Sequence, residues 1–546
     1  MRPLLRTMWV ALAALACGAA MADEPMLDYT VVRGDTLIGR GNSLLRSPSD
    51  WREVARINRL PDPNRIRPGQ VLRIPQRMLR SSPVPARLVS AEGDVRVDSA
   101  AATVGATVAP GQRLATGEAS SAVLQLGDGS RVKLTPGSDT TLAEHRRFDL
   151  KPNATAGDGS GDSVFASTMR LLRGGVEVLA TKVLRAKPLE VETPTAVIGV
   201  RGTEYRVHLD EAAEAATGTE VLDGRVRADL AQSTAGADVA AGQGARLKPG
   251  QAPLVVALAP APDLAAVPQR FERPVLRFSL PGEPMGLRVQ VAADAAFDRI
   301  VRDERFAPGA EVRVAGLDDG QWQLRIRRVD AQGIEGYDAR REVTLKARPE
   351  PPAAVAPTPR AKLPVGPVAL SWAENTEATA YRVEVARDKA FTQVVQRFDN
   401  LPRAQAEAAL AEPGVYQWRL ASVRAGGDLG PWGDPQSFEL RPLPTPPEGG
   451  LSGDGSQLAL SWGGRPEDRQ QVELARDAGF QEVVARDTLA ESRWTLPTPS
   501  RSGAYFFRYR AVEPDGFTTP WSSTLKVEVP RDWSFLWLLL PAALLL

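Results

Sequence analysis

The sequence is poor in the residues that most hydrolytic, metal and redox sites require. Its 546 residues include one cysteine, Cys17, and two histidines, His145 and His208. The patterns His-Glu-x-x-His and Gly-x-Ser-x-Gly and the glycine-rich phosphate-binding loop are absent. These absences argue against a zinc peptidase, a serine hydrolase and a nucleotide hydrolase. We therefore expect a protein that is not an enzyme and that uses no cofactor or metal.

The sequence also lacks an excess of charge of either sign. Lys and Arg number 67 against 66 Asp and Glu, which leaves a formal net charge of +1 at pH 7. Such a chain has no overall basic field to attract phosphates, so we do not expect nucleic-acid binding. Its length is too great for one hydrophobic core, and several domains are expected.

Residues 1–22 have the composition of a secretory signal. Two arginines precede an apolar run from Met8 to Ala16, and Ala20-Met21-Ala22 forms a small-x-small cleavage site. We therefore expect export to the periplasm or cell envelope. Because Cys17 lies inside this segment, cleavage after Ala22 leaves a chain without thiols or disulfides. Cleavage before Cys17, followed by acylation of this cysteine, is the alternative.

Residues 29–75 carry the motifs of a small glycan-binding module. The pieces are an opening strand at 29–32, the turn Gly34-Asp35-Thr36-Leu37, a helical segment at 51–58 and a closing strand at 66–75. Together they closely resemble a LysM module, which we place at 27–77. The resemblance implies a βααβ fold that binds glycans containing N-acetylglucosamine, such as peptidoglycan, in a shallow groove.

By that resemblance the groove lies between the first turn and the end of the second helix. Its predicted residues are Gly34, Asp35, Thr36, Leu37, Asn58, Arg59, Leu60, Pro61 and Ile66. Asp35 is also expected to accept hydrogen bonds from the first amides of the following helix. The module departs from the family at Gly39-Arg40-Gly41, where apolar residues and alanine are usual, and each glycine costs a helix interior about 1 kcal/mol.

The middle of the chain, 87–254, alternates glycines with short β segments. The segments GQRLATG (111–117), LQLGDGSRVKL (124–134) and ETPTAVIGVRGTEYRV (192–207) resemble FecR-type domains. The resemblance implies a β-solenoid-like extracytoplasmic domain that scaffolds or relays protein contacts. In the founding regulators such a domain follows a cytoplasmic helical domain and a membrane span, which this chain replaces with a signal and a LysM. Within the last segment we interpret Gly202 as a tight bend rather than part of a catalytic loop.

The C-terminal half repeats itself. Residues 287–301, 381–395 and 471–484 share an Asp-x-x-Phe pattern, and a Gly-x-aromatic strand starts 26 residues after each shared Asp. Alternating apolar and polar residues predict strands, and the pattern resembles fibronectin type III or immunoglobulin-like sandwiches. The many tryptophans are interpreted as core residues rather than a sugar-stacking face. The sandwiches are placed at 270–346, 364–442 and 456–530.

Segments rich in proline and alanine separate these parts and are predicted to be exposed spacers, at 81–85, 254–268, 347–367 and 441–455. The last residues, 531–546, contain fourteen consecutive uncharged residues, WSFLWLLLPAALLL. A helix of that length reaches about 21 Å, which is short of a hydrocarbon core of about 30 Å. We therefore expect this tail to dock on or partly enter a membrane, and the alternative is packing against the third sandwich.

Taken together, the sequence predicts a mainly β, multidomain envelope protein that binds peptidoglycan or another N-acetylglucosamine glycan. It would present its other modules as a scaffold to an envelope protein not identified by the sequence. An extracytoplasmic component of a FecR-like signalling system is the alternative, and a peptidoglycan hydrolase is the remote one.

Overall fold

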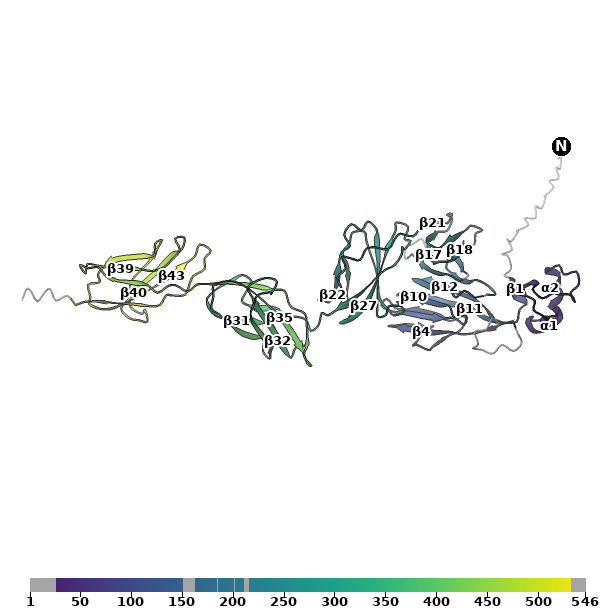
Figure 1. The fold of residues 1–546 in the computed structure, drawn as a ribbon, viewed down its shortest axis with the longest axis horizontal. Helices are drawn as coiled ribbons and strands as arrows, with labels where there is room; N and C mark the ends of the chain where they lie inside the picture. The colour runs from purple at the N-terminus through teal and green to yellow at the C-terminus, as the bar shows by residue number, and fades with distance from the viewer. Residues whose placement is uncertain (1–25, 151–162, 184, 201, 211–215, 532–546) are drawn as a thin grey trace, which may run out of the picture. The chain divides into compact units, whose positions relative to one another are not determined.

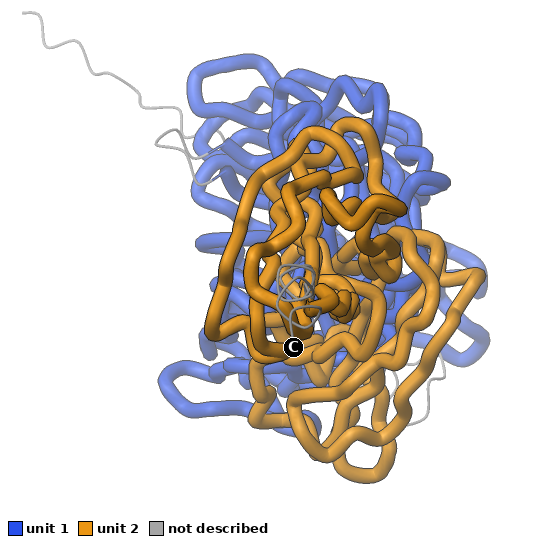
Figure 2. The backbone as a smooth tube through the Cα atoms, turned by 90° about the vertical axis from the view of Figure 1, so that its left-hand side faces the viewer, with its two compact units in different colours: residues 1–345 blue, residues 346–546 orange. Residues whose placement is uncertain are grey.

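The computed structural model describes residues 26–150, 163–183, 185–200, 202–210 and 216–531. The predicted signal with Cys17 and the apolar tail from residue 532 lie outside this part. The chain divides into two compact units, 1–345 and 346–546 (Figure 2). Strands dominate both units, as expected from the sequence. None of the helices in the described part has the length and apolarity needed to cross a bilayer.

The N-terminal module has the predicted βααβ order (Figure 1). Strand β1 (Met26–Thr30) pairs antiparallel with β2 (Val71–Pro75), and the helices α1 (Leu37–Leu44) and α2 (Trp51–Ile57) lie between them in the chain. Short 3₁₀ turns precede α2 (η1, Pro48–Asp50) and follow β2 (η2, Gln76–Met78).

Helix α1 begins with a threonine cap, not with the expected aspartate. The Thr36 hydroxyl accepts a hydrogen bond from the Gly39 N–H at 3.0 Å, whereas Asp35 bonds elsewhere. The glycines of α1 allow close packing. A Cβ on Gly41 would lie 3.1 Å from Trp51 Cβ, and one on Gly39 would lie 2.7 Å from the capping hydroxyl. Gly41 therefore allows the segment from Pro48 to Trp51 to pack closely on α1, and Gly39 leaves space for the Thr36 cap.

The middle domain consists of two sheets. Among the described residues one sheet, here the inner sheet, has nine strands in the order β21-β20-β17-β16-β13-β10-β9-β4-β7. Its strands are β4 (Ala86–Glu92), β7 (Thr107–Val108), β9 (Ser121–Gln125), β10 (Arg131–Leu134), β13 (Gly175–Leu179), β16 (Glu204–Leu209), β17 (Thr217–Asp223), β20 (Gln243–Leu247) and β21 (Leu254–Ala257).

The second sheet, here the outer sheet, has the order β19-β18-β15-β14-β12-β11-β8-β5-β6, and β3 also pairs with β11. Its strands are β3 (Ser82–Pro83), β5 (Val95–Val97), β6 (Ala100–Ala101), β8 (Arg113–Thr116), β11 (Asp139–Asp149), β12 (Ser163–Arg173), β14 (Leu189–Glu192), β15 (Ala196–Val200), β18 (Arg225–Leu230) and β19 (Gly236–Ala240).

The chain crosses back and forth between these sheets as it advances along both of them. Apolar residues that alternate along each strand, such as Val178 and Val207 from one sheet and Leu142 and Ile198 from the other, fill the space between the sheets. Neighbouring strands pair antiparallel, with β12 and β14 as a parallel exception. The two sheets thus grow in chain order with mainly antiparallel pairing, and the solenoid-like character expected from the resemblance stays a prediction.

The N-terminal module shares a core with the middle domain. Phe148 near the end of β11, Leu150 directly after it, and Val164 and Ala166 on β12 are buried in the same apolar cluster as the module's own core, which includes Leu72. The N-terminal module and the middle domain are therefore joined by apolar packing as well as by the connecting chain.

Sandwich 1 also belongs to unit 1. Its strands β22 (Arg270–Phe271), β28 (Ala339–Leu345), β27 (Gly320–Val329), β24 (Gly286–Ala292) and β25 (Ile300–Phe306) form one sheet, and β23 (Leu276–Phe278) pairs with β26 (Val312–Val314). The preceding segment, 254–268, is not an exposed spacer as predicted. It begins with β21 of the inner sheet, and Leu264 and Val267 are buried.

Unit 2 contains two further sandwiches. Sandwich 2 comprises β29 (Ala354–Ala356), β30 (Ala361–Pro364), β31 (Gly366–Trp372), β32 (Ala380–Ala386), β33 (Val394–Leu401), β34 (Gln405–Leu410), β35 (Gly414–Arg424), β36 (Asp428–Leu429) and β37 (Gln436–Arg441). Sandwich 3 comprises β38 (Glu448–Leu451), β39 (Gln457–Ser461), β40 (Arg469–Ala475), β41 (Val483–Leu489), β42 (Arg493–Pro497), β43 (Gly503–Val512) and β44 (Leu525–Val529). Each sandwich has a three-stranded sheet and a larger sheet. In sandwich 2 these are β29-β31-β34 and β30-β37-β35-β32-β33, with β36 paired to β35. In sandwich 3 they are β38-β39-β42 and β41-β40-β43-β44.

Three of the six tryptophans interpreted as core residues of unit 2 are buried. Trp418 is 0% exposed, and Trp372 and Trp462 are buried as well, whereas Trp432, Trp494 and Trp521 are half-buried. The Tyr416 hydroxyl donates to the carbonyl of Glu412 at 2.9 Å, four residues earlier, which is the tyrosine-corner bond of such sandwiches. Tyr505 makes the same bond in sandwich 3.

The Asp-x-x-Phe pattern is a turn motif. In sandwich 1 the Asp294 carboxylate accepts hydrogen bonds from the backbone N–H groups of Asp298 (3.2 Å) and Arg299 (2.8 Å), four and five residues ahead. The other two repeats make the same pair of bonds. Phe297 stands at φ 55°, and its counterparts also have positive φ. The aspartate therefore repeats because it closes a turn in which the phenylalanine adopts a left-handed conformation.

Candidate glycan-binding site

The residues predicted to line the glycan groove differ in exposure. Gly34, Thr36, Arg59 and Pro61 are exposed, Asp35, Asn58, Leu60 and Ile66 are half-buried, and Leu37 is buried. Leu37 is only 3% exposed, so its side chain belongs to the module core. Leu60 and Ile66 also pack against that core with part of their surface. The exposed members are therefore the ones available to a ligand, Gly34 through its backbone and Thr36, Arg59 and Pro61 also through their side chains.

Asp35 holds the first loop together. Its carboxylate accepts hydrogen bonds from the Tyr29 hydroxyl at 2.6 Å, the Val32 N–H at 2.9 Å and Arg40 Nε at 2.7 Å. Burial opposes ionisation, but the bonds from Arg40, Tyr29 and Val32 outweigh it and lower the pKa of Asp35. Burial and the bond to Asp35 raise the pKa of Tyr29. The Asp35 side chain, only 2% exposed, is thus an anion that fixes the loop from within.

Asn58 closes the second loop in a similar way. Its side-chain amide donates to the carbonyls of Val54 (2.8 Å) and Arg73 (2.7 Å), and its Oδ1 accepts from the Arg73 N–H at 2.7 Å. These bonds tie the end of α2 to β2. Arg59 follows at φ 51°, so the chain turns sharply where the groove is predicted. Both loops are therefore held in shape by their own polar residues before any ligand binds.

Two apolar side chains beside the first loop were missed by the sequence reasoning. Val32 is 48% exposed and Ile38 is 45% exposed, one on each side of the turn from Gly34 to Leu37. Exposed apolar groups next to a polar turn suit the apolar face of a sugar ring better than they suit water. The signal was available in the sequence, because each residue directly follows another apolar residue, Val31 or Leu37, that is buried.

The segment around Gly202 is a bend, as interpreted from the sequence. Gly202 has φ 69°, and a Cβ there would lie 2.6 Å from Lys182 Cγ. Thr203 is buried and Glu204 begins β16. Arg201 lies outside the described residues. The described part of this loop therefore serves packing and chain reversal.

His145 is a structural residue although a serine is its neighbour. Its Nε2 accepts a hydrogen bond from the Gly127 N–H at 3.0 Å, so its Nδ1 carries the proton that meets Ser167 Oγ at 2.9 Å. Both side chains are buried. Burial lowers the pKa of His145. A neutral, water-excluded imidazole that donates to a serine cannot activate that serine as a base.

Comparison with known families supports the two N-terminal domains. Residues 29–75 match the LysM domain model, and residues 112–227 match the model described as FecR protein. The chain carries a LysM domain and a FecR domain. A search of curated proteins found no match.

The chain is also similar to solved fibronectin structures. These include the FN1-FN3 domains of chicken CNTN1, at 13% identity and TM-score 0.20, covering 48% of this chain and 95% of that chain. Fibronectin(III)-like modules of CbhA from Clostridium thermocellum match at 13% identity and TM-score 0.20, covering 32% and 93%. The fibronectin III-like fold of the sandwiches rests on their strand order and tyrosine-corner bonds.

A second polar cluster, buried between the FecR domain and sandwich 1, is called here the ionic interface. Arg325 donates to both carboxylate oxygens of Glu177, at 2.7 and 3.1 Å. Arg327 bridges Glu177 (2.7 Å), Glu335 (2.9 Å) and Asp338 (2.5 Å) while only 1% of its side chain is exposed. Burial opposes the charge of Glu177, but Arg325 and Arg327 outweigh it and hold its pKa well below the usual range.

Further contacts extend the ionic interface on both sides. Arg206 of β16 donates to Asp338 at 2.7 Å and to the Gly336 carbonyl at 3.0 Å. At the Asp-x-x-Phe turn of sandwich 1, Asp298 pairs with Arg131 at 2.6 Å and with Lys133 at 2.9 Å on β10. Sandwich 1 is therefore fastened to the inner sheet by charges from two separate segments.

Comparison of the repeats shows which residues adapt sandwich 1 to this role. In sandwich 2, Arg419 pairs with Glu384 of its own sheet and lies 4.4 Å from the centre of the Trp432 ring. Sandwich 3 has the equivalent set Arg508, Glu473 and Trp521. In sandwich 1 the glutamate position holds Gln290 and the tryptophan position holds Asp338. Arg325 therefore lacks an acidic partner on the neighbouring strand and takes Glu177 of the FecR domain instead.

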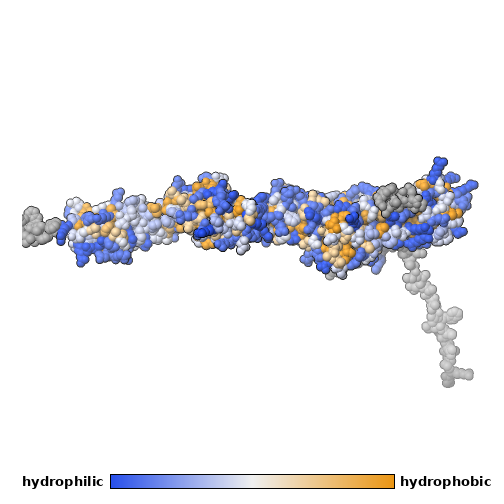
Figure 3. All heavy atoms as spheres, turned by 90° about the horizontal axis from the view of Figure 1, so that it is seen from below, coloured by the Kyte–Doolittle hydropathy of each residue, from blue (hydrophilic) through white to orange (hydrophobic). Residues whose placement is uncertain are grey.

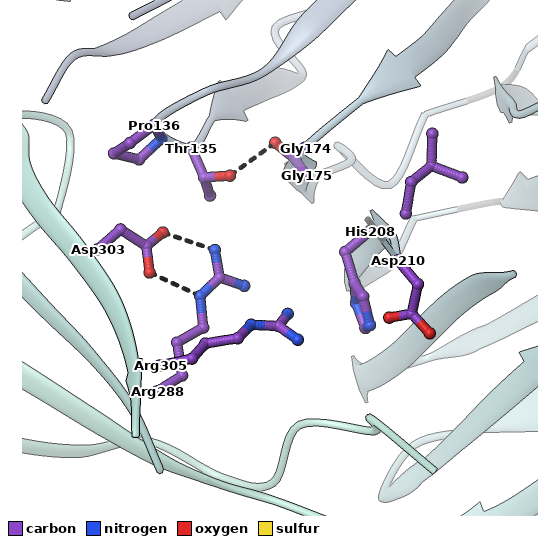
Figure 4. Close-up of a pocket in the computed structure, with 10 residues that line it drawn as sticks. Thr135, Pro136, Gly174, Gly175, His208, Asp210, Arg288, Asp303 and Arg305 are labelled. Atoms are coloured by element: carbon purple, nitrogen blue, oxygen red, sulfur yellow. Dashed lines mark hydrogen bonds and ion pairs between the residues drawn. The ribbon is translucent and has the colours of Figure 1, made fainter. Parts of the chain in front are cut away.

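A cavity of about 340 Å³ adjoins the ionic interface (Figure 4). His208 and Asp210 line it from the FecR domain, and Arg288, Asp303 and Arg305 line it from sandwich 1. The Arg288 guanidinium is bound by the Asp303 carboxylate at 2.8 and 2.6 Å. His208 is buried, and neither of its ring nitrogens has a hydrogen-bond partner, although its Nδ1 lies 3.5 Å from Glu220.

Proposed function

We propose that this protein is a non-catalytic scaffold of the cell envelope that binds peptidoglycan through its LysM domain. The match of residues 29–75 to the LysM family carries the proposal, because that family binds N-acetylglucosamine glycans. Two loops preset by Asp35 and Asn58, with exposed Val32 and Ile38 beside them, support binding at the predicted groove. The pairing of this domain with a FecR domain supports the envelope location.

The shared core gives the binding event a consequence for the rest of unit 1. Phe148 and Leu150 of the FecR domain are buried together with LysM core residues, and the Arg40 guanidinium donates to the Leu150 carbonyl at 3.4 Å. A glycan held by the LysM domain would therefore also orient the FecR domain. The FecR domain and the sandwiches then present surfaces to a protein partner of the envelope.

Sedimentation with purified sacculi tests the glycan assignment. The full chain should pellet with sacculi and stay in the supernatant without them. Removal of the LysM domain is a poor test, because it uncovers Phe148 and Leu150, so a point substitution is preferable. Ile38→Asp places a charge beside the groove and should weaken pelleting by about tenfold, since an exposed apolar contact is replaced by a solvated carboxylate.

Val104→Asp is the matched control, because Val104 is 62% exposed on the FecR domain, far along the chain from the groove. It should pellet like the parent protein. A parent protein that stays in the supernatant at every sacculus concentration would refute the proposed function. Equal losses in the two variants would remove the groove from the proposal.

A further inference from the structure

A polar cleft lies where the LysM domain meets the FecR domain, outside the predicted glycan groove. Its volume is about 570 Å³. Gly39, Asn42 and Ser43 of α1 form one wall, and the connecting residues from Arg80 to Ser82 together with Asp149 form the other. Asn42, Arg80 and Ser82 are exposed, so amide, guanidinium and hydroxyl groups face solvent here.

The cationic group of this cleft is anchored. Arg80 donates from Nε to the Leu45 carbonyl at 2.6 Å, and its backbone N–H donates to the Leu44 carbonyl at 2.7 Å. Arg46 makes the reciprocal bond from its Nε to the Leu79 carbonyl at 3.2 Å. A guanidinium fixed through Nε presents its terminal nitrogens in a defined direction, which is the arrangement that binds carboxylates well.

The anionic group of the cleft is already neutralised by the protein. Asp149 pairs with Arg147 at 2.8 Å and accepts a hydrogen bond from Ser163 at 3.0 Å. Behind the cleft, Arg146 donates to Ser81 Oγ at 2.9 Å. The charge that the cleft offers to a ligand is therefore positive.

The LysM domain as a whole has the same sign. Residues 26–80 contain eleven arginines, no lysine and five acidic residues, a net charge of +6 in a chain whose total is +1. Figure 3 shows hydrophilic residues over much of the visible face at the N-terminal end of unit 1. A neutral glycan gives no reason for such an excess, whereas an acidic ligand does.

The cleft lies within reach of the groove. Asn42 is six residues beyond Thr36 on the same helix, which is about 9 Å along its axis at 1.5 Å per residue. Peptidoglycan differs from other N-acetylglucosamine glycans in that alternate sugars carry short peptides with free carboxylates. An extended peptide of four residues spans about 13 Å. A peptide attached to a sugar in the groove can therefore reach the cleft.

We propose that the cleft between α1 and residues 80–82 binds the acidic peptide carried by peptidoglycan, with Arg80 as the residue that pairs with its carboxylate. The proposal rests on the proposed function and deepens it, because it names the feature that would distinguish peptidoglycan from peptide-free N-acetylglucosamine polymers. Asn42 and the connecting serines would hydrogen-bond the peptide backbone.

The test compares two soluble ligands for the full chain by calorimetry. One is a peptidoglycan fragment of four sugars with its peptides, and the other is the same fragment after an amidase has removed them. The peptide-bearing fragment should bind about tenfold more tightly, as expected for one charge-assisted pair, and this advantage should shrink at high salt. Equal affinities for the two fragments would overturn the inference and leave the proposed function standing.

Arg80→Gln sharpens the comparison. This variant should bind the peptide-free fragment like the parent protein and lose the tenfold preference for the peptide. Arg52→Gln removes the same charge from an exposed position on α2, beside Trp51, and should keep the preference. If both variants lose it equally, the domain's overall charge is responsible and the cleft is not the site. If neither fragment binds the parent protein, the proposed function fails and the inference fails with it.

Discussion

Arg325 of sandwich 1 and Glu177 of the FecR domain form a two-bond ion pair, at 2.7 and 3.1 Å, across 148 residues of sequence. Both residues are buried. Burial of two charges costs free energy, and the Coulomb attraction and the additional bonds from Arg327 offset that cost only while every partner is in place. The pair therefore fixes how sandwich 1 docks more than it adds to stability, and any single loss in it should be expensive.

Glu177→Gln tests that expectation. The substitution removes the charge that Arg325 and Arg327 share, and the free energy of unfolding of unit 1 should fall by about 3 to 5 kcal/mol. The loss is measured by urea unfolding of the full chain, with hydrogen exchange of amides in unit 1 as the probe. Glu118→Gln is the control, because Glu118 is exposed, and it should change the stability by no more than about 0.5 kcal/mol. A small effect of Glu177→Gln would mean that water replaces the pair.

The repeat comparison gives a second prediction. Asp338→Trp restores the residue that sandwiches 2 and 3 use at this position, and it removes the partner of Arg206 and Arg327. Sandwich 1 should then undock while its own core remains folded. Limited proteolysis in 258–269 should become several-fold faster. Trp432→Asp makes the opposite exchange in sandwich 2, and unchanged cleavage in 258–269 is expected there.

The local parts of this fold could be predicted and the ionic interface could not. The order of elements in the LysM domain and the strands of the sandwiches depend on turns, helix caps and the alternation of apolar and polar residues. These patterns extend over only a few residues, so short segments such as Gly34 to Leu37 are enough to predict them. Charged residues on a strand, by contrast, resemble a solvated face, and nothing near Arg325 indicates that Glu177 will cover it. The available signal was comparative, because Gln290 and Asp338 break the pattern of the other two repeats.

The candidate site shows the same division. The exposed loop positions such as Thr36 and Pro61 followed from the family resemblance, and their role in glycan binding stays a prediction. The roles of Asp35 and Asn58 in holding the two loops required coordinates, since Asp35 accepts from the side chains of Tyr29 and Arg40 rather than from the first amides of the following helix. Asp35 and Thr36 both carry side-chain oxygens that can cap a helix. Only the backbone conformation shows that Thr36 is the cap of α1.

His208 should make the stability of unit 1 depend on pH. Burial disfavours the imidazolium, but the negative charges of Glu220, 3.5 Å from Nδ1, and of Glu335 outweigh burial and the opposing charge of Arg305, so the pKa of His208 is raised above 6.5. A raised pKa contributes stability that is fully present below about 6.5 and is lost as pH rises through the folded-state value. Urea unfolding should therefore show a less stable unit 1 at about pH 8.5 than at about pH 6.

His208→Gln should remove that part of the pH dependence between the two conditions. His145 contributes an opposite effect between pH 6 and its ordinary value of 6.5, because its lowered pKa reduces stability there, and this contribution is the same in the parent protein and in the variant. If the free energy of unfolding of the His208→Gln protein changes with pH as it does in the parent, another group causes the pH dependence. If the free energy of unfolding of the parent does not change above pH 6.5, the imidazole is neutral in the folded state.

Gly202→Val tests the bend in the FecR domain. Two costs should add at this position, because φ is 69° and the new side chain would begin 2.6 Å from Lys182 Cγ and 3.1 Å from Lys182 Cα. We expect a loss of about 2 kcal/mol or more in the free energy of unfolding. Gly250→Val separates the two costs, since Gly250 has φ 73° but no atom within 4 Å of the new Cβ. That variant should lose only the backbone part, about 1 kcal/mol. Equal losses would show that the lysine side chain moves aside and that backbone conformation alone explains the glycine.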